Sequence, residues 1–254
     1  MKCDSLKYVF SEPGNWKGLK DYLDCFFKIM QPVESDNKLF FCLVQVFSSS
    51  LEKPSMYLHN RFPLDWQKNY ATKNYHLVDP SWAHAKHSTI PFFWSDLKKL
   101  TDEQKAMVDD AKEHGLNGGV LVPFHGRAGY SLLWIMSSLS DNDCRDELVS
   151  AKNIAYDMFP FVYESVKKVF FGGRPILSKR EAEVLYWVAE GLRTEDVSQK
   201  LCISAVTVEK HIANSCKKLD AKNRTQCVRM AVNLGLLIPR ETCFDFSVRS
   251  NYVK

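Results

Sequence analysis

A break containing glycine and proline divides the chain into two parts with different hydrophobic patterns. It lies in VFFGGRPILS, residues 169–178, where Gly172, Gly173 and Pro175 cannot continue a helix and suit a linker. Helical and strand patterns alternate before this break, and helical patterns follow it. We therefore predict two domains, residues 1–171 and 177–238, a linker at 172–176 and a C-terminal tail at 239–254.

The first part contains two long helical patterns and several strand patterns. Apolar residues at helical spacing predict helices over residues 14–31 and 143–171. Residues 38–47, KLFFCLVQVF, indicate a strand buried on both faces, with which residues 54–60 can pair. The segments GGVLVPF and GYSLLWIMSS flank HGRAG, which is typical of a β-hairpin.

Two shorter helices in this part have clear start signals. Pro63 suits the first turn of a helix over residues 63–74. Thr101 and Gln104 form a capping box that opens a helix, which Gly115 ends. The fold class predicted for the whole chain is therefore α+β. An N-terminal α–β–α sandwich surrounds an antiparallel sheet, and an all-α domain follows it.

The second part indicates four short helices in helix-turn-helix order. Ser178 with Glu181 forms a capping box, and Ser204 suits the N-cap of the third helix. One face of that helix is predicted to pack inward through Val208, Ile212, Ser215 and Leu219. The opposite face carries Val206, Glu209, Lys210, Ala213 and Lys217, and a polar outer face is typical of a recognition helix.

The charge distribution gives weak support to a DNA-binding role for this part. Residues 1–170 carry 20 Lys/Arg and 21 Asp/Glu, whereas residues 177–238 carry 10 and 7. Basic side chains near the third helix could neutralise phosphates, namely Lys218, Lys222, Arg224 and Arg229. An ordinary four-helix bundle with solvated lysines fits the same periodicity, so the pattern alone leaves both interpretations open.

The sequence LSKREAEVLYWVAEGLRTEDVSQKLCISAVTVEKHIANSCKKL resembles the DNA-binding domain of the LuxR family. The resemblance implies that DNA contacts come from Ser204, Thr207, Glu209, Lys210, Ala213, Lys217, Lys218 and Arg224. Two positions depart from the family pattern, because Ala213 is small and Glu209 stands where many relatives have a cationic or polar contact. A glutamate can accept a hydrogen bond from a cytosine amino group, which makes Glu209 a hypothetical specificity residue.

A polar stretch in the first part, WQKNYATKNYHLVDP, carries three side chains whose polar tips could converge on one small molecule. Trp66 and Tyr70 are four residues apart, so they share one side of a helix. The indole N–H of Trp66 is a donor, and an ionised Asp79 is an acceptor. A small ligand with carbonyl groups and one N–H would suit them. The alternative for each residue alone is a core aromatic side chain, or for Asp79 a turn cap.

This stretch resembles the autoinducer-binding domain of the LuxR quorum-sensing receptors, together with FPLDWQKNY, VDPSWAH, FFWSDL and HGLNGGVLVPFHGRAGYS. The resemblance implies an N-acyl homoserine lactone as ligand. Trp66 would then donate to the lactone carbonyl, Asp79 would accept from the amide N–H, and Tyr70 and Trp94 would form walls. The ligand-binding residues so implied are Phe62, Trp66, Tyr70, Asp79, Ser81, Trp82, Trp94 and Gly119.

Phe62 departs from the family pattern in a way that concerns ligand binding. Relatives often have a tyrosine there, whose hydroxyl donates to the amide carbonyl of the ligand, and phenylalanine has no donor. Ser81 or Tyr70 could supply this bond, and the sequence does not decide between them.

Other functional classes fit the sequence poorly. A phosphoreceiver domain would need an acidic pair after its first strand, which KLFFCLVQVF lacks. A lactonase or another enzyme is disfavoured because there is no Gly-x-Ser-x-Gly motif, and His84 and His87 provide at most two metal ligands. The eight cysteines are scattered without Cys-x-x-Cys, so we expect reduced thiols, no metal site and no cofactor. Neither a signal peptide nor a run of roughly 20 apolar residues occurs, so we expect a cytoplasmic protein without membrane association.

The function predicted from the sequence is therefore a lactone-responsive transcription factor that binds double-stranded DNA as a homodimer. The long helix over residues 143–171 is the expected dimer contact. The alternative is a regulator with the same DNA-binding module that senses a different small molecule or a protein partner. A regulatory protein partner, the operator and the direction of regulation are left open.

We predict a preference for a short acyl chain, because Phe40, Trp82, Trp134 and Met136 are bulky enough to narrow the cavity. Titration of the purified protein with lactones of graded chain length measures this preference. Tighter binding of long-chain lactones would contradict it.

Overall fold

The structure is a computed structural model that describes residues 15–32, 37–47, 55–126, 129–172 and 176–237. Contacts divide the chain into two units, residues 1–174 and 175–254, and each unit is described by itself. The division falls inside the predicted linker, of which residues 173–175 lie outside the described residues. The predicted tail, residues 239–254, and residues 127–128 of the predicted hairpin turn also lie outside them.

The first unit is built on a five-stranded antiparallel sheet with the strand order β2-β1-β5-β4-β3. Its strands are β1 (Leu39–Phe47), β2 (Ser55–Asn60), β3 (Phe92–Phe93), β4 (Gly118–Gly126) and β5 (Gly129–Ser137). The predicted pairing of residues 54–60 with the first strand is confirmed, since Val44 lies opposite Leu58. The predicted hairpin is confirmed by the pairing of β4 with β5. The predicted α+β class is therefore correct.

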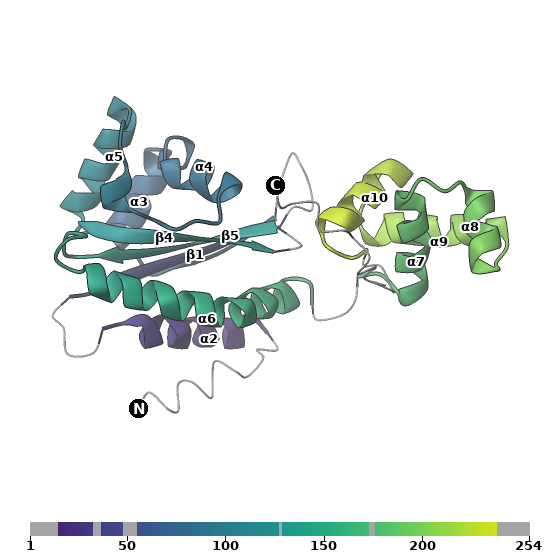
Figure 1. The fold of residues 1–254 in the computed structure, drawn as a ribbon, viewed down its shortest axis with the longest axis horizontal. Helices are drawn as coiled ribbons and strands as arrows, with labels where there is room; N and C mark the ends of the chain where they lie inside the picture. Colours follow the sequence, from purple (N-terminus) through teal and green to yellow (C-terminus); the bar gives the residue numbers. More distant parts are fainter. Residues whose placement is uncertain (1–14, 33–36, 48–54, 127–128, 173–175, 238–254) are drawn as a thin grey trace, which may run out of the picture. The chain divides into compact units, whose positions relative to one another are not determined.

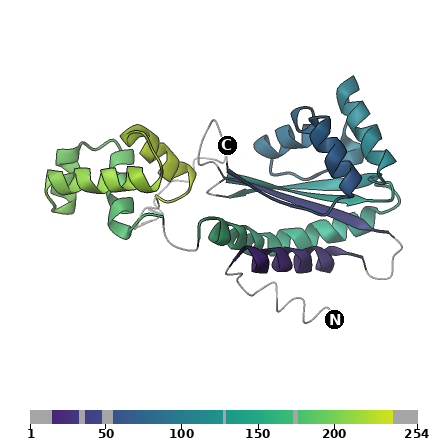
Figure 2. The same cartoon turned by 180° about the vertical axis from the view of Figure 1, so that it is seen from behind.

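Helices cover both faces of this sheet (Figures 1 and 2). Helices α2 (Trp16–Met30) and α6 (Arg145–Phe170) lie on one face, and α3 (Leu64–Thr72), α4 (Pro80–His87) and α5 (Asp102–Glu113) lie on the other. Strand β1 is buried on both faces, as predicted, with Phe40 half-buried. Its alternate residues explain this, because Phe41 stacks on Phe27 of α2 while Cys42 joins the cluster under α3 to α5.

Local signals fix most helix ends in this unit. Thr101 and Gln104 form the predicted capping box of α5, and Gly115 follows its end with φ +78°. Helix α6 passes through Pro160 and remains assigned as one helix. Four elements were not predicted from the sequence: α4, the short strand β3, and the two single-turn helices η1 (Tyr75–Leu77) and η2 (Trp94–Asp96). Asp79 followed by Pro80 was the available signal for α4, since these residues occupy its N-cap and first position.

The second unit contains the four predicted helices: α7 (Lys179–Ala189), α8 (Thr194–Leu201), α9 (Ala205–Lys218) and α10 (Arg224–Asn233). Ser178 and Glu181 form the predicted capping box, and Ser204 caps α9 by accepting from the backbone N–H of Thr207. The predicted inward face is confirmed, because Val208, Ile212, Ser215 and Leu219 are all buried. The helix-turn-helix arrangement predicted from the sequence is therefore present in this unit.

An ion pair between a buried glutamate and an exposed lysine joins two helices of this unit. Lys218 Nζ of α9 lies 2.6 Å from Glu181 Oε2 at the start of α7. Burial alone would raise the pKa of Glu181, but hydrogen bonds from Lys218 and Ser178 outweigh it and the pKa is lowered. Glu181 therefore serves both as a capping residue and as the anchor of Lys218.

We predict that Gly119→Ala destabilises the first unit. A Cβ atom there would lie 2.4 Å from Met136 Sδ and 2.7 Å from the carbonyl oxygen of Ile135, and such overpacking costs about 1–3 kcal/mol. Urea unfolding followed by tryptophan fluorescence measures the change. Gly115→Asn is the control, because nothing lies within 4 Å of its Cβ position and asparagine tolerates positive φ. Equal midpoints for the two variants would contradict the prediction.

Candidate functional site

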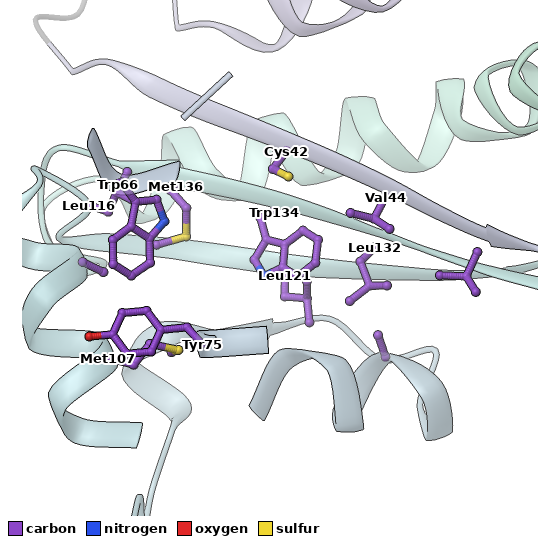
Figure 3. Packing of buried hydrophobic residues seen from close by; sticks show 13 residues of the cluster. Cys42, Val44, Trp66, Tyr75, Met107, Leu116, Leu121, Leu132, Trp134 and Met136 are labelled. Carbon is purple, nitrogen blue, oxygen red and sulfur yellow. The ribbon is translucent and has the colours of Figure 1, made fainter. Parts of the chain in front are cut away.

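The candidate ligand site lies between the sheet and the layer of α3, α4 and α5. Trp66 of α3 is 4% exposed and belongs to an apolar cluster with Tyr75, Met107, Leu116, Trp134 and Met136 (Figure 3). Four of the predicted ligand-binding residues, Phe62, Tyr70, Trp82 and Trp94, are partly buried and pack against this cluster. The structure therefore brings together aromatic side chains from segments that are far apart in the sequence.

A chain of hydrogen bonds crosses from α3 to α4 at the edge of this cluster. The Tyr70 hydroxyl donates to Asp79 Oδ2 at 2.9 Å and accepts from the indole N–H of Trp82 at 3.0 Å. The hydroxyl hydrogen of Tyr70 is thus directed at Asp79. Burial raises the pKa of the Tyr70 hydroxyl, so this group stays protonated and remains a donor.

Asp79 has two roles in this structure. Its Oδ1 accepts from the backbone N–H of Ser81 at 2.8 Å, which caps α4, while its Oδ2 accepts from Tyr70. The side chain is buried, and burial raises the pKa of its carboxyl although hydrogen bonds from Ser81 and Tyr70 oppose the shift. The cap role considered from the sequence is therefore present. It does not exclude a ligand role, because each carboxylate oxygen has a second lone pair.

Trp66 lies next to this chain of hydrogen bonds, and its indole N–H is not used as a donor within the described part of the chain. Its ring meets that of Tyr70 edge to face, with the centroids 5.7 Å apart. Among the described residues its indole N–H has no hydrogen-bond acceptor, and the nitrogen points toward the side of the cluster where Trp134 lies (Figure 3). Tyr70 therefore contacts both the residue with the unused donor, through its ring, and the buried carboxylate, through its hydroxyl.

Asp141 holds the backbone at or next to two predicted ligand-binding residues, Gly119 and Trp94. Its Oδ2 accepts from the backbone N–H of Ser95 at 2.6 Å, and its Oδ1 accepts from the backbone N–H of Gly119. The first bond fixes η2, which carries Trp94 at the cluster. The second bond, with the close approach of Met136, explains why position 119 has no side chain. The sequence analysis did not single out Asp141.

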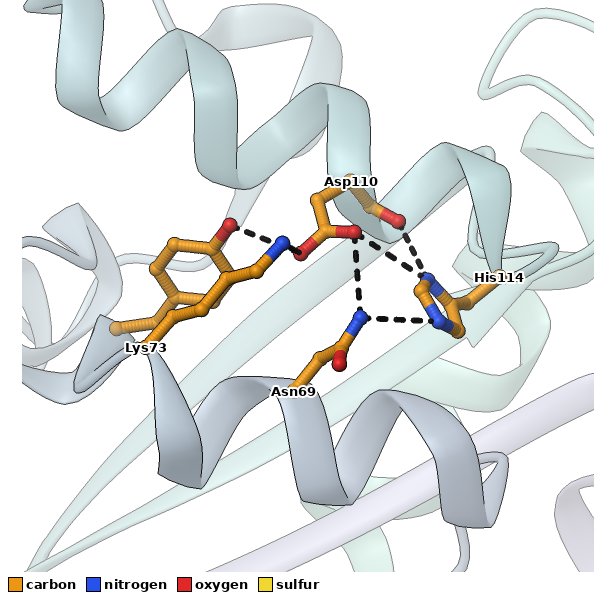
Figure 4. Close-up of polar contacts among 5 residues, drawn as sticks. Asn69, Lys73, Asp110 and His114 are labelled. Atoms are coloured by element: carbon orange, nitrogen blue, oxygen red, sulfur yellow. Dashed lines mark hydrogen bonds and ion pairs between the residues drawn. The ribbon is translucent and has the colours of Figure 1, made fainter.

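A polar network centred on Asp110 locks α3 and η1 to α5 (Figure 4). Asp110 Oδ2 accepts from Lys73 Nζ and from the Tyr75 hydroxyl, each at 2.8 Å, and Asn69 Nδ2 lies 3.4 Å from Oδ1. Burial alone would raise the pKa of Asp110, but hydrogen bonds from Lys73 and Tyr75 outweigh it and the pKa is lowered. This network was also missed. The residues come from three separate segments, so no local spacing could reveal it.

The candidate DNA site is the outer face of α9. Val206, Glu209, Lys210, Ala213 and Lys217 are all exposed there, as predicted, while Thr207 is half-buried. Two other predicted DNA contacts have partners within the protein. Lys218 pairs with Glu181, and Arg224 donates to Thr194 Oγ1 at 3.1 Å and to the carbonyl oxygen of Leu192 at 3.3 Å.

Comparisons with known proteins identify the family to which each unit is similar. The model of the autoinducer binding domain matches residues 19–155, and that of the bacterial regulatory proteins of the luxR family matches residues 175–231. The quorum sensing-dependent transcriptional regulator RpaR of Rhodopseudomonas palustris is 32% identical over 191 residues, which are 72% of this chain and 76% of RpaR. The chain belongs to the LuxR family of quorum-sensing transcriptional regulators.

The chain is also similar to a further relative and to two solved structures. The transcriptional activator AnoR of Acinetobacter nosocomialis is 28% identical over 220 residues, which are 84% of this chain and 92% of AnoR. A structure of SdiA in complex with octanoyl-rac-glycerol has a TM-score of 0.68 at 21% identity, and covers 94% of this chain and 96% of that chain. Escherichia coli SdiA in another crystal form gives a TM-score of 0.67 at 22% identity, with 92% and 96% covered. These structures share the fold.

Membership of the LuxR family defines the general function. The chain is an autoinducer-binding transcription regulator with a helix-turn-helix DNA-binding domain, and its family is not enzymatic. Among the residues described, no group of three or more His, Cys, Asp or Glu side chains could hold a metal ion. None of the helices described has both the length and the apolar character that a bilayer-spanning segment needs.

We predict that Asp110→Asn destabilises the first unit at neutral pH by roughly 1–3 kcal/mol, the cost of weakening a buried charged hydrogen bond. The lowered pKa of Asp110 means that the wild type has this stabilisation above the ordinary carboxyl pKa of about 4. The wild type loses it as the pH falls through the lowered value. Urea unfolding at several pH values should therefore show the two proteins converging in acid.

Asp109→Asn is the matched control for this experiment. Asp109 is the exposed neighbour of Asp110 and pairs with Lys112 three residues on, and such pairs contribute less than about 1 kcal/mol. A constant difference between wild type and Asp110→Asn at every pH would show that the Asp110 charge is not responsible.

Proposed function

We propose that this regulator binds an N-acyl homoserine lactone between its sheet and the layer of α3, α4 and α5. The observation that carries the proposal is the pairing of an unused indole N–H on Trp66 with the buried carboxylate of Asp79 across Tyr70. A lactone of this class has a ring carbonyl that accepts and an amide N–H that donates. The two protein groups therefore match the two polar groups of the ligand in kind.

The proposed contacts follow from the chemistry of each side chain. Trp66 donates to the lactone carbonyl, and Asp79 accepts from the amide N–H through a free lone pair. Tyr70 and Trp94 form walls, together with Phe62 and Trp82, since all four pack against the apolar cluster. A hydrogen bond to a buried charge contributes roughly 1.5–3 kcal/mol, so Asp79 would be the strongest single contact.

Binding at this place would stabilise the layer that the ligand contacts. Helices α3, α4 and α5 are tied together by Asp79 and Asp110, and a ligand that binds the folded layer stabilises it by mass action. We propose that the filled unit dimerises through α6, which exposes Tyr156 and Phe161. A dimer would present two α9 helices to half-sites about one helical turn of DNA apart.

On DNA, the exposed face of α9 would enter the major groove. Thr207, Lys210, Ala213 and Lys217 are proposed contacts, and Ser204 fixes the N-terminus of the helix. Lys210 and Lys217 have no partner among the described residues and can neutralise phosphates. Lys218 and Arg224 remain proposed contacts from the sequence, although each would have to keep or exchange its partner within the protein.

We predict that Trp66→Phe and Asp79→Asn both weaken lactone binding. Phenylalanine keeps the aromatic packing without the N–H donor, and asparagine keeps the N-cap of α4 without the charge. Because a charged hydrogen bond contributes roughly 1.5–3 kcal/mol and a neutral one about 1 kcal/mol, we expect about 10- to 100-fold lower affinity for Asp79→Asn and about fivefold for Trp66→Phe. Mass spectrometry of the lactone retained after dilution, and titration calorimetry, measure the effect.

Asp65→Asn is the control, since Asp65 is an exposed residue in the first turn of the same helix as Trp66. Unchanged lactone affinity in both site variants would contradict the proposed contacts. Retention of some other small molecule, such as an acylated glycerol, or of none at all by the wild type would instead favour the alternative of a different ligand or a protein partner.

A further inference from the structure

We propose that Val206 reads the C5-methyl group of a thymine, and that Glu209 positions α9 rather than reading a base. The proposal concerns DNA reading by the second unit and does not depend on the identity of the autoinducer. It rests on two observations: the exposure of Val206 on the outer face of α9, and the contacts that hold Glu209 against α8 and α10.

Val206 starts a stripe that runs along the outer face of α9. Lys210, Ala213 and Lys217 follow it at +4, +7 and +11, which is the same spacing as the buried stripe that starts at Val208. Because the two stripes start two residues apart, they lie on opposite sides of the helix. Val206 lies at the N-terminal end of its stripe, where recognition helices contact base edges.

Val206 is 79% exposed, the largest value among the large apolar side chains that the structure describes. A single exposed apolar residue needs no explanation on most surfaces. The exposure of Val206 is more informative, because the other residues of its stripe are two lysines and a small alanine, which suit a surface that binds a polyanion. Thymine is the base that presents an apolar group in the major groove, and a branched apolar side chain complements it.

Glu209 lies to one side of this stripe and is held within the protein. Its Oε1 accepts from the Thr194 hydroxyl at 2.6 Å and lies 3.7 Å from Arg224 Nη1. Arg224 also donates to Thr194 and to the carbonyl oxygen of Leu192. Glu209 thus connects α9 to the start of α8 and the start of α10. Both contacts are made by Oε1, so α8 and α10 together set the direction of the carboxylate.

The same contacts explain how a carboxylate is tolerated on a helix that approaches phosphates. The guanidinium of Arg224 lies beside Glu209 and offsets its charge, while Thr194 directs the carboxylate toward α8. Removing the Glu209 contacts should therefore change the placement of α9 on every DNA sequence equally. Removing the Val206 methyl groups should change the preference at one base pair.

The experiment uses the full-length protein and duplexes enriched by it from a random pool. In the enriched duplex each thymine is replaced in turn by deoxyuridine, which removes the C5-methyl group and leaves the hydrogen-bonding pattern unchanged. We expect about a fourfold loss of wild-type affinity at one thymine per half-site, which corresponds to one buried methyl group. Val206→Ala should lose this sensitivity, whereas Val206→Thr, which keeps a methyl group and the branched shape, should retain it.

The positioning role of Glu209 is tested in the same duplexes. Thr194→Val removes the hydroxyl with little change of shape, and Thr194→Ser keeps the hydroxyl. We expect Thr194→Val and Glu209→Ala to lower affinity for all duplexes without changing base preference. The double variant should bind DNA no more weakly than either single variant. Thr194→Ser should bind DNA with the affinity of the wild type. Circular dichroism of each variant confirms that the helices are formed.

Three results would overturn the proposal. Wild-type binding could be insensitive to deoxyuridine at every thymine, or Val206→Ala could keep the sensitivity of the wild type. Glu209→Ala could alter the preference at a cytosine, which would establish Glu209 as a base reader. Failure to enrich any duplex, with or without lactone, would overturn the assignment of α9 as the reading helix.

Discussion

The buried carboxylate of Asp79 is the interaction on which the ligand-facing layer depends. One of its oxygens starts α4, and the other holds Tyr70 of α3, so a single side chain sets the distance between two helices. Trp82 completes the link by donating to Tyr70. A buried charge is tolerated where hydrogen bonds satisfy it, and losing one of them leaves an expensive unpaired group. This arrangement keeps a buried carboxyl group between α3 and α4.

Asp110 performs the corresponding task at the same, C-terminal end of α3. It joins Lys73, Tyr75 and Asn69 to α5, and the ring of Tyr75 in turn packs against Trp66. The pKa values of the two aspartates shift in opposite directions because their partners differ. A lysine lowers the pKa of Asp110, whereas neutral donors near Asp79 do not offset the burial that raises its pKa. The layer is thus fastened by two polar contacts next to an apolar cluster, and a ligand bound beside them would be coupled to both.

Polar contacts between helices also fix the packing of the DNA-binding unit. Lys218 and Arg224 are basic residues close to the recognition helix, and the sequence predicts phosphate contacts for both. In the structure Lys218 pairs with Glu181, and Arg224 contacts Thr194 and Glu209. These charges therefore fix the packing of α9 against α7, α8 and α10. The outer stripe from Val206 to Lys217 is left exposed to meet DNA.

The sequence by itself determined most of the helices, four of the five described strands and the two-part organisation, because hydrophobic period, capping boxes and turn residues are local signals. The buried face of α9, the capping boxes at Thr101 and Ser178, and the β4–β5 hairpin are examples. Spacing also placed Trp66 near Tyr70, since four residues make one helical turn. Only the tertiary structure decided the contacts between elements. These are the Tyr70–Asp79–Trp82 chain, the contacts of Asp110 and Asp141, and the contacts of Glu209 with Thr194 and Arg224. Each joins residues from separate elements, and hydrogen bonds between elements leave no periodic pattern in the sequence.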